Sequence, residues 1–344
     1  MYTATVGFLP WWPQNPYQVL LKRELNALGF RVIGNPPLSL LRILVGRDGL
    51  DVVHVHWPHG LYKTTTQFLH ALAVLVAYRL RHNNLVWTVH ELEAYETRNP
   101  RRDDWFRSVV MRLARRLIVH GEATRKELVD QFGFRGPIDL AQHPSYIGWY
   151  RDEVSAQQAR SRLGLSADAR VFLYFGYIKP YKGVENLLQA FRALAEPRAA
   201  LLVVGRPLDV AIERTVQDLA AADPRVRTVL GYVPDDDVQL YFRAADAVVL
   251  PFRRTQTSGS LMLAMSFGRA IVAPAIATLP EYVDRGSAIL FDPNEANGLA
   301  AALREAFVAN TVWMGENARR QAEARSWAVM AQVHAAAYRA VMDI

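Results

Sequence analysis

The fold is decided by the stretch VFLYFGYIKPYKGVENLLQAF, residues 171–191. It opens with a continuous apolar run, passes through a turn rich in glycine, proline and lysine, and continues as a helix-like segment that extends to Leu194. A buried strand followed directly by a helix is the repeating unit of a parallel α/β sheet. The stretch therefore predicts a parallel sheet covered by helices.

The same alternation runs through both halves of the chain. In the second half, apolar runs typical of buried strands occur at residues 171–178, 201–205, 226–233, 247–251, 270–274 and 288–292. In the first half they occur at residues 5–10, 31–34, 51–57, 85–91, 116–121 and 138–144. Strands alternating with helices twice over predict two Rossmann-like, doubly wound parallel-sheet domains.

The expected domain limits follow from this pattern. We expect a first domain over residues 1–150, a polar linker without strand signals over 151–169, and a second domain over 170–326. A last helix over 327–344 has one apolar face. It either caps the second domain or crosses back to the first.

Composition narrows the class of protein. A chain of 344 residues is long enough for two domains, and 51% hydrophobic with 21% charged residues is typical of a folded protein. The absence of cysteine excludes disulfides and thiolate metal sites. The amino terminus does not resemble an export signal, and the most apolar stretch, residues 68–78, is about half the roughly 20 residues that a spanning helix needs. We therefore expect a cytoplasmic protein.

Charge is distributed unevenly along the chain. The formal net charge of +7 lies entirely in residues 1–165, and the remaining residues balance to zero. This asymmetry predicts an anionic or membrane-associated partner for the first half. Nucleic acid is not expected, because no recognisable reader motif accompanies the charge.

Histidine and tryptophan gather at the strand ends of the first half. Ligands of open parallel sheets bind beyond the carboxyl ends of the strands. A structural role would explain any one of these histidines, but their coincidence at five strand ends favours a binding site. A metal site is the less favoured alternative, and we expect no metal or other cofactor. The residues at these ends include Trp11, Trp12, His54, His56, His59, His90, Glu91, His120, Glu122 and His143.

The second half carries three candidate phosphate-binding segments, and one of them is the short run GRP, residues 205–207, at a strand end. Lys179 and Lys182 lie in the turn between a strand and a helix, where cationic side chains and helix amides can bind phosphate oxygens. A solvated turn is the alternative. The segment TSGS, residues 257–260, opens an apolar helix and would let a diphosphate approach the backbone, unless its serine is an ordinary helix cap.

Four segments in order resemble the GT-B glycosyltransferases, and specifically their large family-4-type group. They are YFGYIKPYKGVENLLQAF, LLVVGRP, VLGYVPDDDVQLYFRAADAVVLPF and SGSLMLAMSFGRAIVAPAIATLPEYV, and they cover almost all of residues 171–283. The first half matches more loosely through DVVHVHW and VWTVHE. The resemblance implies two domains facing each other across a cleft and a nucleotide diphospho-sugar donor.

The resemblance also implies roles for individual residues. His90 occupies the position of the family's active-site histidine. The donor would be bound by Lys179, Lys182, Gly205, Arg206, Tyr232, Val233, Ser258, Gly259, Ser260 and Leu261. On the acceptor side we expect Trp11, Trp12, His56, His59 and His120.

The chain departs from the family pattern in two places. Tyr177 stands where the family usually has an arginine. Thr255 and Leu263 stand where it usually has two glutamates, which argues against a standard retaining member. The pattern is closer to a bacterial exopolysaccharide branch that includes xanthan-type GDP-mannose:glycolipid β-mannosyltransferases. This likeness implies mannose transfer from GDP-mannose to a lipid-linked or polysaccharide-precursor acceptor.

An inverting transfer needs a general base within reach of the acceptor hydroxyl. Glu91, Glu122 and His90 are the candidates in the first half, and Glu91 is preferred because its strand end also carries His90. A helix expected over residues 105–118 has one apolar face and places Arg112, Arg115 and Arg116 on the opposite side. This pattern predicts peripheral attachment to an anionic membrane at the inner face of the plasma membrane, although a helix docked on its own sheet would look similar.

Three other functions remain open from the sequence. The protein could be a retaining family-4-type enzyme with another donor. It could be a sugar-nucleotide epimerase, which needs no acceptor. It could also be a non-catalytic protein of the same fold that binds a nucleotide sugar without releasing free nucleotide.

Overall fold

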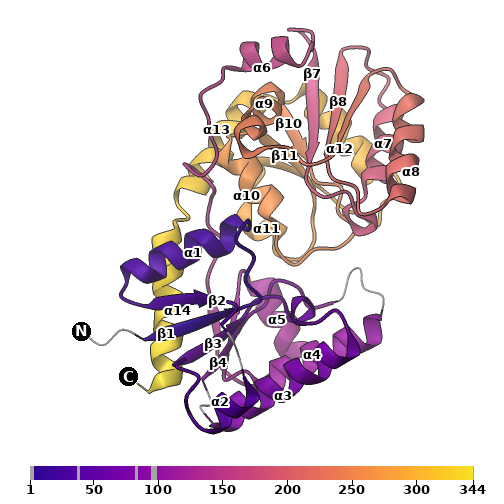
Figure 1. Cartoon of the computed structure of the whole chain (residues 1–344). Helices are drawn as coiled ribbons and strands as arrows, with labels where there is room; N and C mark the ends of the chain where they lie inside the picture. The colour runs from indigo at the N-terminus through magenta and orange to yellow at the C-terminus, as the bar shows by residue number, and fades with distance from the viewer. Residues whose placement is uncertain (1–3, 37–38, 82–83, 94–98, 344) are drawn as a thin grey trace. The chain divides into compact units, whose positions relative to one another are not determined.

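The computed structural model describes residues 4–36, 39–81, 84–93 and 99–343. The chain divides into two compact units (Figure 1). The first unit comprises Met1–His143 together with Ser326–Ile344, and the second comprises Pro144–Arg325. Among the described residues, no helix has the length and apolar character needed to cross a bilayer.

The first unit is built on a parallel sheet of six described strands in the order β2-β1-β3-β4-β5-β6. Its strands are β1 (Thr5–Leu9), β2 (Arg31–Gly34), β3 (Val52–Val55), β4 (Leu85–Thr88), β5 (Arg116–Val119) and β6 (Ile138–Leu140). Its helices are α1 (Pro16–Ala27), α2 (Leu40–Leu44), α3 (Thr65–Arg81), α4 (Pro100–Leu113), α5 (Glu122–Asp130) and α14 (Trp327–Met342). A short 3-10 turn, η1, spans Pro58–Leu61.

The second unit also contains a six-stranded parallel sheet in its described residues, in the order β12-β11-β10-β7-β8-β9. Its strands are β7 (Arg170–Phe175), β8 (Ala199–Gly205), β9 (Val226–Leu230), β10 (Ala247–Val249), β11 (Ala270–Pro274) and β12 (Ala288–Phe291). Its helices are α6 (Ala156–Arg162), α7 (Val184–Arg192), α8 (Val210–Ala221), α9 (Val238–Ala244), α10 (Gly259–Ser266), α11 (Leu279–Tyr282), α12 (Gly298–Val308) and α13 (Thr311–Glu323). The 3-10 turns η2 and η3 span Pro180–Lys182 and Asp235–Asp237.

Every apolar run that the sequence analysis assigned to a strand contains one, so the predicted pair of parallel sheets is confirmed. The central strands are buried on both faces because helices cover both sides. In the first unit, α1 and α14 lie against each other, and α3 lies beside both α2 and α4 (Figure 1).

The last helix, α14, completes the core of the first unit. It contacts α1 and strands β3 to β6. The hydroxyl oxygen of Tyr338 on α14 lies 2.6 Å from Nδ1 of His54 on β3, and both side chains are buried. Nε2 of His334 lies 3.4 Å from the hydroxyl of Thr88 on β4. These polar contacts tie α14 to the centre of the sheet.

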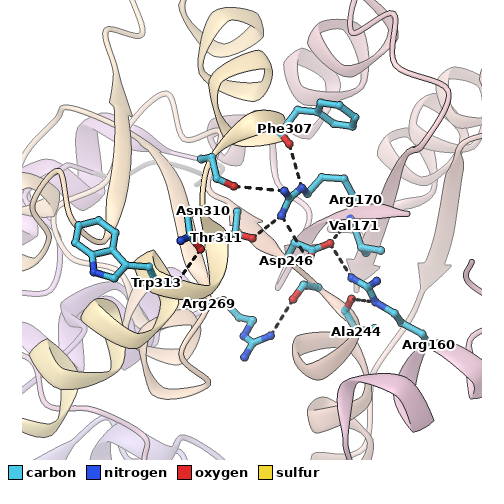
Figure 2. Close-up of polar contacts among 12 residues, drawn as sticks. Arg160, Arg170, Val171, Ala244, Asp246, Arg269, Phe307, Asn310, Thr311 and Trp313 are labelled. Atoms are coloured by element: carbon cyan, nitrogen blue, oxygen red, sulfur yellow. Dashed lines mark hydrogen bonds and ion pairs between the residues drawn. The ribbon is translucent and has the colours of Figure 1, made fainter. Parts of the chain in front are cut away.

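The segment expected as a linker, residues 151–169, belongs instead to the second unit and contains α6. A network at the amino edge of the second sheet holds it there (Figure 2). Arg160 of α6 donates to the carboxylate of Asp246 at 2.7 Å, and the same carboxylate accepts the amide of Val171 on β7 at 2.7 Å. Arg170 donates to the carbonyl of Phe307, which attaches the end of α12 to the same edge.

Candidate functional site

The strand order of the second unit marks one place for a ligand. The chain runs outward from β7 to β8 and β9, then returns to β10 and continues to β11 and β12 on the other side. Ligands of such sheets bind at the carboxyl ends of the strands where this direction reverses. In this unit the reversal lies between β7 and β10, which are followed by Gly176 and by the segment 251–258.

The ends of β7 and β8 and the first turn of α10 approach one another closely at this point. Gly205 has φ +148°, and a Cβ atom there would lie 1.8 Å from the carbonyl oxygen of Gly176. A Cβ atom on Gly176, which has φ +136°, would lie 3.3 Å from Oγ of Ser260. The amide of Ile178 donates to the carbonyl of Arg206 at 2.9 Å. Only glycine permits this backbone approach, so Gly205 shapes the edge that faces a ligand.

The amino terminus of α10 adjoins the same edge. Ser258 caps the helix, and its Oγ accepts the amide of Leu261 at 3.1 Å. The N–H of Leu261 is therefore engaged by the Ser258 cap in this structure, and its predicted contact with the donor stays a prediction. Gly259 and Ser260 occupy the first turn, where helix amides and the helix dipole favour an anion.

Both candidate lysines lie on the turn after β7. Nζ of Lys182 lies 3.9 Å from the centre of the Phe252 ring, and Nζ of Lys179 lies 5.8 Å from the centre of the Tyr181 ring. The amide of Arg253 donates to the carbonyl of Tyr181 at 2.9 Å. This bond joins the turn after β7 to the segment after β10, so positive charge is concentrated at the point where the strand order reverses.

Tyr232 and Val233, two further residues predicted to bind the donor, differ in how far their side chains are exposed. Tyr232 is 76% exposed and can present its ring to a nucleobase. Val233 is buried in the core of the second unit, so a contact between this residue and the donor would have to come from its backbone, and its role stays a prediction. The amide of Gly231 donates to the carbonyl of Gly205 at 3.0 Å, which holds this segment beside the end of β8, next to the exposed Arg206.

The positions of the missing glutamates are filled by structural contacts. Thr255 is buried and its hydroxyl donates to the carbonyl of Thr257 at 2.9 Å. Leu263 is buried in the core of α10. Neither residue supplies a carboxylate to this edge of the sheet.

In the first unit, the histidines at the strand ends come together around one residue that the sequence analysis missed. The ring of Tyr17, near the start of α1, lies 4.8 Å from that of His90, 5.5 Å from that of His120 and 5.3 Å from that of His143. Its centroid is 6.0 Å from that of His56. The Asn-Pro signal of a helix start preceded Tyr17 in the sequence, but nothing in the sequence showed which rings it would contact.

Burial keeps five imidazoles of the first unit neutral. It lowers the pKa values of His54, His56 and His90 well below the usual value, and those of His120 and His334 to about 4. Nδ1–H of His120 donates to the carbonyl of Ala141 at 2.7 Å, which fixes its tautomer. Within the residues that the structure describes, no three His, Asp or Glu side chains are placed to hold a metal ion.

Glu91 follows His90 at the end of β4 and has two polar neighbours. Its carboxylate lies 2.7 Å from Nδ1 of His59 and 3.9 Å from a guanidinium nitrogen of Arg107, whose side chain is buried on α4. The structure thus places Glu91 and His59 together. Glu122 begins α5 and pairs with Arg125 at 3.1 Å in a largely exposed ion pair.

Tryptophans occupy the reversal point of the first sheet, between β1 and β3. Trp12 stacks on Trp57 with ring centroids 4.6 Å apart, and Trp57 in turn stacks on His90 at 4.1 Å. Trp57 was missed in the sequence analysis, although it directly follows the HVH run of β3. Trp11 instead packs over Gly34, where a Cβ atom would lie 2.2 Å from the indole. Trp11 therefore has a packing role.

The amphipathic helix expected over residues 105–118 is two elements. α4 ends at Leu113, and Arg116 already begins β5. Phe106 and Val110 are fully buried, so the apolar face of α4 is used in the unit's own core. The alternative of a helix docked on its own sheet was the better interpretation.

Two of the three arginines that were to face a membrane are paired within the first unit. Arg116 makes two hydrogen bonds to the carboxylate of Asp139, at 2.7 and 2.9 Å. Arg115 donates to Asp343 at 2.9 Å. These partners reduce the charge that this segment can offer to a membrane.

Comparison with known proteins bears on both units. Residues 169–308 match the family described as glycosyl transferases group 1, and residues 13–143 match glycosyltransferase family 4. The chain is 31% identical over 252 residues to the GDP-mannose:glycolipid 4-beta-D-mannosyltransferase of Xanthomonas campestris pv. campestris, an alignment covering 70% of this chain and 67% of that enzyme.

The chain belongs to the family 4 glycosyltransferases. It is a glycosyltransferase with GT-B architecture, as the sequence predicted. Another family member that it resembles is the D-inositol 3-phosphate glycosyltransferase of Geodermatophilus obscurus, with 31% identity over 242 residues, covering 67% of this chain and 53% of that protein.

Solved structures of glycosyltransferases share the fold over nearly the whole chain. Sucrose-phosphate synthase from Thermosynechococcus elongatus superposes with a TM-score of 0.78 at 19% identity, covering 99% of this chain and 100% of that one. Anabaena HepE, crystallised with UDP and glucose, superposes with a TM-score of 0.71 at 16% identity. The superposition covers 97% of this chain and 99% of HepE. At these identities the likeness establishes the architecture and not the substrate.

Proposed function

We propose that this glycosyltransferase transfers mannose from GDP-mannose to a glycolipid acceptor with inversion at the anomeric carbon. The observation that carries the proposal is the placement of Glu91 between His59 and Arg107, directly after His90. The printed activity of the Xanthomonas relatives supports the donor and acceptor classes.

The donor diphosphate binds the second unit at the carboxyl ends of β7, β8 and β10. Lys182 and Lys179 supply positive charge, and the first turn of α10 supplies backbone amides. The exposed ring of Tyr232 stacks on the nucleobase. As the bond to the sugar breaks, negative charge grows on the diphosphate, and these groups stabilise it most at that moment.

Glu91 acts as the general base in the first unit. The acceptor hydroxyl gives its proton to the Glu91 carboxylate while its oxygen bonds to the anomeric carbon. The bond from that carbon to the diphosphate oxygen breaks, and its electron pair leaves on GDP. His59 and Arg107 orient the carboxylate, and His90, held neutral by burial, can hydrogen-bond to the sugar without adding charge.

A mechanism with a single displacement at the anomeric carbon is consistent with the replacement of the family's two glutamates by Thr255 and Leu263. Thr255 and Leu263 supply no carboxylate beside the donor, and the described base candidates lie in the first unit. One displacement by an activated hydroxyl inverts the configuration. A glycolipid acceptor also requires the enzyme to work at a bilayer, and we propose peripheral attachment to the inner face of the plasma membrane in a pathway of exopolysaccharide synthesis.

The product's stereochemistry tests the mechanism. With α-linked GDP-mannose as donor, NMR of the product should show a β-linked mannose. Glu91→Gln should reduce turnover at least a hundredfold and leave GDP binding unchanged, because the donor residues lie in the other unit. An α-linked product, or normal turnover by Glu91→Gln, would overturn the proposal.

One observation favours a second candidate function. The relatives named D-inositol 3-phosphate glycosyltransferases reach 31% identity to this chain. By analogy, the acceptor would be a water-soluble phosphorylated polyol and the donor another nucleotide sugar. Incubating the enzyme with a panel of nucleotide sugars and both acceptor classes, and measuring released nucleotide, separates the two candidates.

A further inference from the structure

Exposed apolar side chains gather on two neighbouring helices of the first unit. Leu41, Leu44 and Val45, at and just after α2, are 69%, 57% and 53% exposed. On α3, Leu69 is 58% exposed and Leu80 is 83% exposed. Soluble proteins seldom expose so many large apolar side chains on adjacent elements unless the surface binds something.

The apolar residues of α3 lie on two opposite faces. One face, including Phe68, Leu75 and Tyr78, is buried in the core of the first unit. The other face also carries apolar residues at helical spacing. Leu69 and Leu80 are exposed there, whereas Ala73 and Val76 are half-buried and Leu72 packs partly against the core. At 100° per residue this second face is centred roughly opposite the first. A helix that only covered a sheet would carry polar residues there.

α2 extends this face at the carboxyl end of α3. The two helices are in contact (Figure 1). A Cβ atom on Gly46, just beyond α2, would lie 2.9 Å from the guanidinium of Arg81 on α3. We term the exposed apolar residues of these two neighbouring helices the α2–α3 surface: Leu40, Leu41, Leu44, Val45, Leu69 and Leu80.

The charges on α2 and α3 themselves have one sign. The two helices carry Arg42, Arg79 and Arg81 and contain no acidic residue. The next acidic residues, Asp48 and Asp51, are partly buried, and the Asp51 carboxylate accepts the amide of Thr5 at the sheet. Leucines flanked by arginines suit the boundary between lipid tails and anionic headgroups, since the arginine stems can lie along apolar surface while the charges remain at headgroup level.

We propose that the α2–α3 surface lies on the anionic surface of a phospholipid bilayer and is the membrane-attachment surface of this enzyme. This inference rests on the proposed function, because attachment to a bilayer would bring the enzyme to its glycolipid acceptor. The surface itself is defined by the exposure and charge of its residues. It replaces the segment of residues 105–118, whose apolar face is buried.

Vesicle sedimentation of the full chain tests the proposal. The wild type should bind vesicles of phosphatidylcholine with 30% phosphatidylglycerol, and binding should weaken as salt rises. The triple variant Leu41→Ser/Leu69→Ser/Leu80→Ser should bind about tenfold more weakly or worse, because three apolar anchors are lost. Arg42→Gln/Arg81→Gln should bind more weakly and depend less on salt.

A matched control variant changes exposed apolar residues of the second unit. Val308 and Val312 are 79% and 71% exposed, and Val308→Ser/Val312→Ser should bind vesicles like the wild type. All variants should keep the wild-type melting temperature, since each replaced side chain is exposed. Lack of wild-type binding, equal binding by the triple variant, or equal loss in the control would overturn the proposal.

Two further measurements separate bilayer attachment from dimerisation through the same surface and from failure of the proposed reaction. If the wild type is a dimer by light scattering and the triple variant is a monomer, the surface joins two copies and the bilayer proposal is wrong. Turnover with a short-chain, water-soluble acceptor should be unaffected by the triple variant, whereas turnover with vesicle-embedded acceptor should fall. Failure of the proposed reaction would abolish both activities in the wild type and leave its vesicle binding intact.

Discussion

The indole of Trp57 lies nearly parallel to the imidazole of His90, with ring centroids 4.1 Å apart and planes inclined by 14°. Trp12, which is 37% exposed, stacks on Trp57 with its centroid at 4.6 Å. The three rings form a continuous stack at the reversal point of the first sheet. Trp57 therefore fixes the plane of His90, and we expect Trp12, at the exposed end of the stack, to contact a sugar.

Replacing the middle ring of this stack should reduce turnover. We expect Trp57→Leu to lower kcat about tenfold or more, because His90 would lose its positioning contact, while Trp57→Phe should retain most activity. Trp12→Leu should mainly raise KM for the acceptor. Steady-state kinetics with both substrates varied provides the measurement. Equal losses in Phe and Leu variants, together with a lowered melting temperature, would indicate a purely structural role.

Lys182→Ala should weaken binding of the nucleoside diphosphate. A charge-assisted hydrogen bond contributes about 1.5–3 kcal/mol, so affinity for GDP should fall by roughly 10- to 100-fold in titration calorimetry. Lys63→Ala, which removes an exposed lysine of the first unit, serves as the control and should leave the affinity unchanged. Unchanged GDP affinity in Lys182→Ala would mean that the phosphate site lies elsewhere.

Gly205→Ala should damage both folding and donor binding. The new methyl group would meet the carbonyl of Gly176 at 1.8 Å, in a backbone conformation that alanine rarely adopts. We expect a loss of about 3 kcal/mol or more in the free energy of unfolding. Gly231→Ala is the matched control, because its Cβ atom would meet nothing within 4 Å. Denaturant unfolding of both variants measures the difference, and similar stabilities would contradict the assigned backbone contact.

Mild acid should destabilise the first unit. The pKa values of His120 and His334 fall to about 4 in the folded state, compared with about 6.5 when unfolded. The unfolded chain therefore binds more protons between these values, and the stability present above pH 6.5 is lost as the pH falls toward 4. Each such imidazole should contribute on the order of 1 kcal/mol per pH unit in this range.

Denaturant unfolding between pH 7 and pH 4.5 measures this loss. His334→Gln should flatten the dependence on pH, whereas His70→Gln, at an exposed position of α3, should not. A stability that is constant over this range would show that the buried histidines become charged without cost.

The strands were predictable because buried parallel strands are continuous apolar runs, which are visible in the sequence without knowledge of their neighbours. The end of α4 was not, because Arg115 and Arg116 continue the amphipathic period of the helix into a strand of four residues. α6 was overlooked because it is short and polar, although Ser155 and Gln158 form a capping box that could have identified its start.

The candidate site divides in the same way. Lys182 and Ser260 could be predicted as donor-binding candidates because they belong to local strand–turn–helix patterns. Tyr17 was not found, because its contacts with His120 and His143 join parts of the chain more than a hundred residues apart. Trp57 was missed since only the strand order reveals that it meets Trp12 at the reversal point of the sheet.

The place of α14 in the first unit has a consequence for how the protein is made. When residues 1–143 have emerged from the ribosome, α14 has not yet been synthesised. This helix carries Tyr338, which hydrogen-bonds to His54, and His334, which contacts Thr88. All of the second unit, residues 144–325, emerges before that helix does. The first unit is therefore completed only after the second unit has been made, and until α14 is synthesised His54 and Thr88 lack these buried partners.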